Sequence, residues 1–318
     1  MSKFQDKLIN KLNATGIAEK TTENYLKQIR VIYTMITGKP HTKMSSFAFL
    51  KDSGTVIKAL TDKYAPSSKK TMLASIMKVL NISGVAYQKL YKVYFEEFLK
   101  MAGELNSHSD EKTPKQQENW VSLEQLRDVQ RRYKDLVDEF KNDSEITMKQ
   151  YNELLSYLIV SLYLDAEPER SENYFNMEYV DTMDKATNKN KNYYVDKEGV
   201  FVFNKYKTAN TDPNRGEPIE ISPALKKVID LYLSFRPTNA ECFVAKYNGG
   251  CFSSSPDWSR RVSQAFGQFL PDKKIGSQML RNIYYTEKYK DSKLEKEKDA
   301  RKMKTSVKMI DKVYTKRD

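Results

Sequence analysis

Four side chains that suit chemistry on a phosphodiester stand at separate places in the chain. They are Arg170, Lys207, Arg281 and Tyr314, in a sequence with only 12 arginines against 42 lysines. In its transition state a phosphodiester carries negative charge on its non-bridging oxygens, and a planar guanidinium can bind two of these oxygens at once. Two arginines can therefore stabilise this charge without a metal ion. The sequence predicts metal-free phosphodiester chemistry if the fold brings these residues together.

One of the arginines belongs to a short helical pattern. Gln278 and Arg281 are three residues apart, so on a helix they share a face. Leu280 and Ile283 would then point to the other side and pack into the core. Gln278 can donate a hydrogen bond to a phosphate, but an amide cannot carry a proton between groups. The pattern therefore predicts a phosphate-binding helix face that lacks a general base.

The residues around these side chains resemble the active site of tyrosine recombinases, the phage-integrase family, over nearly the whole chain. Arg170 follows a long apolar segment and precedes Glu172, as the first catalytic arginine does in that family. Residues 278–281 resemble its His-x-x-Arg box, and Tyr314 ends a segment similar to the one that carries its nucleophile. The resemblance implies that Tyr314 forms a 3′-phosphotyrosyl link to DNA and that Arg170 and Arg281 are the catalytic arginines.

The resemblance also implies that Lys207 protonates the departing 5′-oxygen, a task that suits a flexible ammonium group. Lys205 is two residues away and would project to the same side of a strand, so it remains an alternative. Either lysine could instead be an exposed contact to the phosphate backbone. Similarly, Arg170 could simply form a salt bridge with Glu169 or Glu172 at the start of a helix.

Both positions where the family most often has a histidine hold other residues. Gln278 takes the first position, and Thr305, nine residues before Tyr314, takes the second, where the family has histidine or tryptophan. The Thr305 hydroxyl can still donate a hydrogen bond to phosphate. His41 and His108 lie in or before the expected linker and cannot replace these residues locally. The resemblance therefore leaves open whether Gln278 and Thr305 substitute for the histidines.

The composition favours a polyanionic partner. The 318-residue chain has a net charge of +12 and a pI near 9.3, and +6 of that charge lies in residues 288–318. This charge could equally belong to a solvated helical face with i,i+4 ion pairs. No run of about 18 apolar residues exists that could span a membrane, and the first residues lack the apolar core of a signal peptide. Cys242 and Cys251 are too few for a disulfide scaffold or a four-ligand zinc site, which favours a reducing, intracellular compartment.

Periodicity divides the chain into two domains. Apolar stripes at residues 25–36, 72–80 and 87–98, with a weaker one at 4–12, predict an N-terminal helical bundle over residues 1–102. The resemblance implies that this bundle is the DNA-binding (core-binding) domain. Lys69, Lys70 and Lys78 are expected on its polar side, where they and Lys205 would contact DNA. Residues 103–117 are polar and without periodicity, so they predict a linker.

Residues 118–318 are expected to form the catalytic domain. A capping-box pattern at Ser122 predicts a helix start, and the helix at residues 151–164 is apolar all round and should be central. Strand signals at 200–203 and 218–221 predict a small antiparallel sheet, and Ser222 precedes a proline in a pattern that begins a helix. The predicted fold class is mainly α with this one small sheet: a helical core-binding bundle followed by a tyrosine-recombinase catalytic domain.

The resulting hypothesis is a site-specific DNA recombinase or integrase that needs no metal and no cofactor. In its amino-acid sequence the chain resembles members of the family from large DNA viruses and their mobile elements. This resemblance would place it in the host nucleus or cytoplasm. The family implies double-stranded DNA as partner, a homo-tetramer on DNA, and a monomer or dimer without it. Two alternatives remain: a type IB topoisomerase, which relaxes supercoils by the same tyrosine chemistry, and a catalytically weakened DNA-binding relative.

Overall fold

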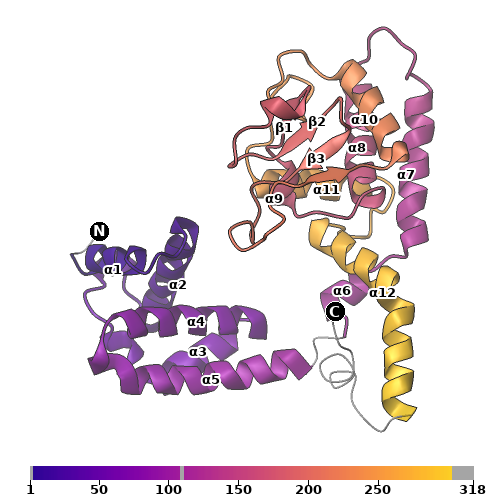
Figure 1. The fold of residues 1–318 in the computed structure, drawn as a ribbon. Helices are drawn as coiled ribbons and strands as arrows, with labels where there is room; N and C mark the ends of the chain where they lie inside the picture. The colour runs from indigo at the N-terminus through magenta and orange to yellow at the C-terminus, as the bar shows by residue number, and fades with distance from the viewer. Residues whose placement is uncertain (1–2, 108–110, 303–318) are drawn as a thin grey trace. The chain divides into compact units, whose positions relative to one another are not determined.

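The computed structural model describes residues 3–107 and 111–302, and its contacts divide the chain into two compact units, residues 1–112 and 113–318 (Figure 1). The division falls inside the segment expected to be a linker. That segment is more regular than predicted, because a helix of the first unit continues to Ser107 and another helix begins at Pro114. Thr113 and Gln116 form a capping box there, which stabilises the first turn despite the polar sequence.

The smaller unit is the helical bundle that its apolar stripes predict. Its elements are α1 (Lys3–Asn13), α2 (Glu19–Thr37), η1 (His41–Lys43), η2 (Ala48–Leu50), α3 (Ser53–Lys63), α4 (Pro66–Ile82), η3 (Val85–Tyr87) and α5 (Gln88–Ser107). Ile29, Ile76 and Tyr94, one from each predicted stripe, are fully buried in its core. Asp52 accepts a hydrogen bond from the backbone of Thr55 and so caps α3.

The larger unit contains the remaining helices and all strands of the described residues. Its elements are α6 (Pro114–Asn119), α7 (Leu123–Asp138), α8 (Met148–Leu164), α9 (Ser171–Tyr174), β1 (Glu178–Val180), η4 (Met183–Lys185), β2 (Tyr193–Val195), β3 (Val200–Val202), β4 (Pro218–Glu220), α10 (Pro223–Phe235), α11 (Ser255–Gly267) and α12 (Ser277–Lys302). The mainly helical class with one small sheet is therefore confirmed.

Helix α8 is the centre of this unit, as its all-round apolar sequence predicts. Most residues from Tyr151 to Leu164 are buried, and the helix contacts α7, α10 and α11 (Figure 1). The predicted helix starts are also present. Ser122 forms the capping box of α7, and Ser222 caps α10 with a proline in its first turn.

The sheet is mixed, whereas the sequence predicted an antiparallel one. Strand order is β1-β2-β3-β4, and β3 pairs antiparallel with both neighbours, but β1 runs parallel to β2. The parallel pair joins Tyr179 to Tyr194 in register. Strand β1 has only three half-buried residues, so it lacks the alternation that would have revealed it in the sequence.

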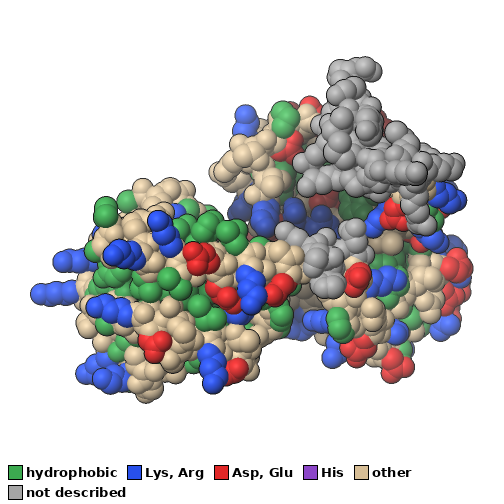
Figure 2. Space-filling model, turned by 90° about the horizontal axis from the view of Figure 1, so that it is seen from below, with side chains coloured by type: hydrophobic (Ala, Val, Ile, Leu, Met, Phe, Trp, Pro, Cys, Tyr) green, Lys and Arg blue, Asp and Glu red, His purple; other side chains and the backbone are tan. Residues whose placement is uncertain are grey.

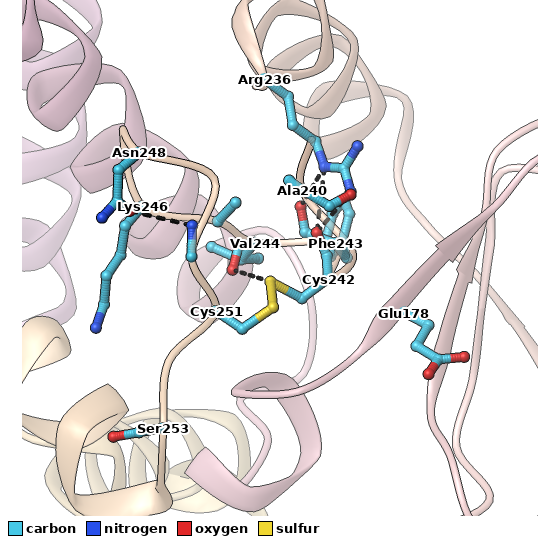
Figure 3. The surroundings of a disulfide bond; sticks show 12 residues. Glu178, Arg236, Ala240, Cys242, Phe243, Val244, Lys246, Asn248, Cys251 and Ser253 are labelled. Carbon is cyan, nitrogen blue, oxygen red and sulfur yellow. Dashed lines mark hydrogen bonds between the residues drawn. A yellow bond between two sulfur atoms is a disulfide. The ribbon is translucent and has the colours of Figure 1, made fainter. Parts of the chain in front are cut away.

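The two cysteines form a disulfide, which their number alone did not predict. Cys242 and Cys251 close the loop that follows α10, and Arg236 donates hydrogen bonds to the carbonyls of Ala240, Cys242 and Phe243 beside it (Figure 3). Disulfides persist in oxidising surroundings. This pair therefore gives no support to the expectation of a reducing compartment.

In the described part of the chain, no helix has both the length and the apolar character needed to cross a membrane.

Candidate active site

Hydroxyl groups join three helices, α9, α11 and α12, beside the two predicted catalytic arginines. The Oγ of Ser171, at the start of α9, lies 2.8 Å from the Oγ of Ser259 in α11 and 3.0 Å from the Oγ of Ser277, the first residue of α12. Arg170 directly precedes Ser171, and Arg281 follows Ser277 by four residues on the same helix face. The serine hydrogen bonds therefore fix the backbone that carries one arginine against the helix that carries the other.

A half-buried carboxylate, that of Glu169, lies within electrostatic reach of both arginines. The pKa of Glu169 is raised above its ordinary value, because burial has the largest effect on it. A hydrogen bond from Asn173 and the positive charges of Arg281 and Arg170 act in the opposite direction and offset part of this rise. The Nδ2 of Asn173 donates to Oε2 of Glu169 over 2.7 Å. Because both guanidinium groups act on one carboxylate, the fold brings Arg170 and Arg281 into one neighbourhood although 111 positions separate them in the sequence.

The alternative interpretation of Arg170 as half of a salt bridge is wrong for the described residues. Arg170 forms no ion pair with Glu169 or Glu172 within 4.0 Å there, although Glu169 is its sequence neighbour. Three buried polar atoms of this region also lack a hydrogen-bond partner in the described part of the chain: Nε of Arg281, Oε1 of Glu172 and Oδ1 of Asn173. A buried donor without a partner costs about 1–3 kcal/mol. An anion near Arg281 would remove this cost.

Arg170 lines a pocket of about 400 Å3 at the edge of the sheet. One wall comes from α9 and the two residues before it, and the other from the connection between β3 and β4 together with the start of β4. Its lining residues are Glu169, Arg170, Asn173, Phe203, Tyr206, Thr208, Asp212, Asn214, Glu217, Pro218 and Ile219. Burial and the hydrogen bond to Asp212 raise the pKa of Tyr206 to about 12, so this phenol stays protonated at neutral pH and can donate.

The candidate lysines lie in the connection that forms this wall. Strand β3 ends at Val202, so Lys205 and Lys207 follow the strand, and the prediction that they share one side of it is wrong. Both side chains are exposed, and among the described residues Lys207 has no hydrogen bond or ion pair. Turn hydrogen bonds from Ala209 to the carbonyl of Tyr206 and from Thr211 to that of Thr208 shape the backbone locally. The connection therefore presents Lys207 to solvent on a compact turn.

The buried amide of Asn192 attaches this connection to α9. Its Oδ1 accepts from the backbone N–H groups of Asn204 (2.9 Å) and Lys205 (2.7 Å). Its Nδ2 donates to the carbonyls of Asn173 and Lys205, both at 3.0 Å. Asn192 thus makes four hydrogen bonds, the full capacity of two donors and two acceptor sites, and ties the lysine-bearing connection to the helix next to Arg170.

Two positions of the predicted active site lie outside the described residues, and a third is exposed. Thr305 and Tyr314 belong to the undescribed segment after α12, so their predicted roles stay predictions. Gln278 is exposed and donates to Oδ1 of Asn282 over 3.0 Å. Leu280 and Ile283 are buried on the other side of α12, which confirms the inward face predicted from the sequence.

The predicted DNA contacts of the smaller unit need correction. Lys69 is only 5 % exposed and forms an ion pair with Glu97, so the prediction that it lies on the polar side is wrong. Lys70 and Lys78 are half-buried, and the ammonium of Lys70 lies 5.5 Å from the ring centre of Phe98. The α4 periodicity left these lysines opposite the apolar stripe, but α5 packs against this side and covers part of it.

Sequence reasoning missed the residues that organise the site. Glu169 was considered only as a salt-bridge partner, and the serines at 171, 259 and 277 carry no motif because their spacing along the chain is irregular.

On the described part of the face shown in Figure 2, Lys and Arg side chains lie among Asp and Glu side chains on both units. The described residues contain no group of three His, Cys, Asp or Glu side chains placed to hold a metal ion.

No protein-family model matches the chain, and comparison with curated proteins and with solved structures gives no match.

Proposed function

We propose that this protein is a tyrosine recombinase or integrase that cuts and rejoins DNA through a 3′-phosphotyrosyl intermediate. The observation that carries the proposal is the shared neighbourhood of Arg170 and Arg281 around Glu169, with the serine hydrogen bonds fixing the backbone at both. Two guanidinium groups in one place suit the charge that develops on the non-bridging oxygens of a phosphodiester. Arg281 also has a buried Nε without a partner among the described residues.

Each remaining residue has a role that its position allows. Lys207 has no hydrogen bond or ion pair among the described residues and lies on a turn next to the Arg170 pocket, from which its ammonium could protonate the departing 5′-oxygen when DNA lies along the site. Gln278 shares a helix face with Arg281 and could exchange its hydrogen bond to Asn282 for one to phosphate. Tyr314 would attack the phosphorus, and the bond to the 5′-oxygen would break as the phosphotyrosyl ester forms.

The proposal is tested by trapping the covalent intermediate. The full chain is incubated with a pool of nicked duplexes whose central segments are randomised. The nick lets the cleaved end diffuse away, which traps the intermediate, and the randomised segment removes the need for a known target site. Denaturation in detergent should leave DNA attached to the protein, and peptide mapping should locate the phosphate on Tyr314. EDTA should not reduce the yield, because arginines take the place of metal in this chemistry.

Two variants make the result decisive. Tyr314→Phe should abolish the adduct, whereas Tyr289→Phe, which alters an exposed tyrosine of α12, should leave it unchanged. An adduct that persists in Tyr314→Phe refutes the nucleophile assignment. Relaxation of a supercoiled plasmid without strand exchange between two duplexes would favour the topoisomerase alternative, and salt-sensitive DNA binding without any adduct would favour the catalytically weakened relative.

A further inference from the structure

The smaller unit has a cationic pocket on the side of α2, apart from the lysines first expected to bind DNA. The pocket has a volume of about 600 Å3. Its lining residues are Lys27, Arg30, Val31, Thr34, Met35, His41 and Lys63. Three of these seven side chains carry a permanent positive charge and none is a carboxylate. Acidic and basic side chains are usually interspersed in a chain where 30 % of residues are charged. A lining with cationic side chains and no carboxylate therefore favours the binding of an anion.

A buried amide holds the arginine of this pocket in place. Gln5 of α1 is fully buried, and its Oε1 accepts a hydrogen bond from Nε of Arg30 over 3.1 Å. Its Nε2 donates to the carbonyl of His41 over 2.7 Å. One buried side chain thereby fixes the Arg30 guanidinium relative to η1. Such preorganisation lowers the conformational entropy that a cation loses when it binds an anion.

The two lysines complete the pocket from different helices. Lys27 precedes Arg30 by three residues, so both lie on one face of α2, and Lys63 comes from the last turn of α3. Both lysines are exposed and neither forms an ion pair among the described residues. The exposed carboxylate nearest to Lys27 in the sequence, Glu23, is already paired with Lys20 at 2.9 Å. The charges of Lys27 and Lys63 are therefore not neutralised by an ion pair within the described residues.

We infer that this pocket binds a phosphate group of the DNA backbone. A fixed guanidinium with two mobile ammonium groups suits the oxygens of a phosphodiester, and Val31 and Met35 offer apolar contact to the adjoining deoxyribose. The inference rests on the proposed function, because it takes DNA as the partner. It assigns the phosphate contacts of the smaller unit to α2 and α3 in place of α4.

The test compares the salt dependence of DNA binding by full-length variants. Binding of a fluorescent duplex is measured by anisotropy over a series of salt concentrations, because each phosphate contact contributes about 0.9 to the slope of log K against log salt. Lys27→Gln with Lys63→Gln should lower the magnitude of this slope by about 1.8, the value for two lost contacts. Arginine at both positions should preserve it.

A matched control removes the same charge elsewhere in the unit. Lys89→Gln with Lys92→Gln alters two exposed lysines of α5 and should change the slope by less than the pocket variant does. Equal changes in both variants overturn the inference and leave the proposed function intact. If the wild-type protein binds no duplex at all, the inference and the proposed function both fail.

A second arm separates DNA from free phosphate. Inorganic phosphate and pyrophosphate are added to the wild type and to the Lys27→Gln, Lys63→Gln variant, and thermal unfolding is followed. We expect equal melting temperatures with and without these anions, because a single small anion lacks the sugar contacts. If phosphate stabilises only the wild type while the DNA slopes stay equal, the pocket binds a free anion and the DNA assignment is wrong.

Discussion

Replacement of Asn192 by alanine should unfold the larger unit more easily and disturb the candidate site. The side chain is 2 % exposed and makes four hydrogen bonds, to the backbones of Asn173, Asn204 and Lys205. Alanine would leave two backbone donors without these bonds and remove one bond from each of two carbonyls. Each of the four contributes about 0.5–1.5 kcal/mol, so the expected loss is on the order of 4 kcal/mol. In a unit of this size that corresponds to a decrease in melting temperature of about 8–16 °C.

The chain offers a selective probe for this measurement. Both tryptophans, Trp120 and Trp258, belong to the larger unit, and Trp258 is fully buried in its core. Tryptophan fluorescence during urea unfolding of the full chain therefore follows the larger unit alone. Asn142→Ala, at an exposed position, should change the free energy of unfolding by less than about 0.5 kcal/mol. A loss below about 1 kcal/mol for Asn192→Ala would refute the view that this amide connects the lysine-bearing turn to α9.

Two further predictions concern the arginine neighbourhood. Because burial raises the pKa of Glu169, the native state keeps this proton to a higher pH than the unfolded chain, so its carboxyl lowers stability as pH rises from the ordinary value of 4.5 through the folded pKa. As pH rises from 4 to neutrality, the free energy of unfolding of Glu169→Gln, measured with urea, should therefore increase relative to that of the wild type. A parallel pH dependence of both proteins would contradict the assignment. Gln278→Ala should slow single-turnover cleavage by about 10²–10³-fold if this amide donates to the phosphate, and Gln278→His should be neutral or harmful. An unchanged rate in Gln278→Ala, or faster cleavage by Gln278→His, would instead indicate a decayed site.

Local sequence signals predicted several of the helices because each signal has a direct structural cause, whereas α3 and α11 were not predicted. Ser122 caps α7 as the Ser-x-x-Gln pattern requires, and the apolar surface of α8 can be buried only at the centre of a domain. Strand β1 was missed because three half-buried residues carry no periodicity. Its parallel pairing with β2 depends on the chain crossing between them, which composition does not encode.

The candidate site shows the same division between local and long-range information. The sequence could nominate Arg170 and Arg281 by type and setting, but their common neighbour Glu169 and the hydroxyl contact of Ser171 with Ser277 depend on tertiary structure. Lys69 illustrates the reverse error. Its place on the polar side of α4 was a sound inference for an isolated helix, and packing against α5 buried it.

The Cys242–Cys251 bond makes residues 242–251 a closed covalent ring within the larger unit. Lys246 and Asn248 lie inside this ring, on the loop that follows α10 (Figure 3). Hydrolysis of a peptide bond anywhere between the two cysteines would open one arm of the ring and leave the other arm intact. The part of the chain with Arg170 and the part with Arg281 would stay joined through sulfur, so a cut in this loop would separate them only after reduction.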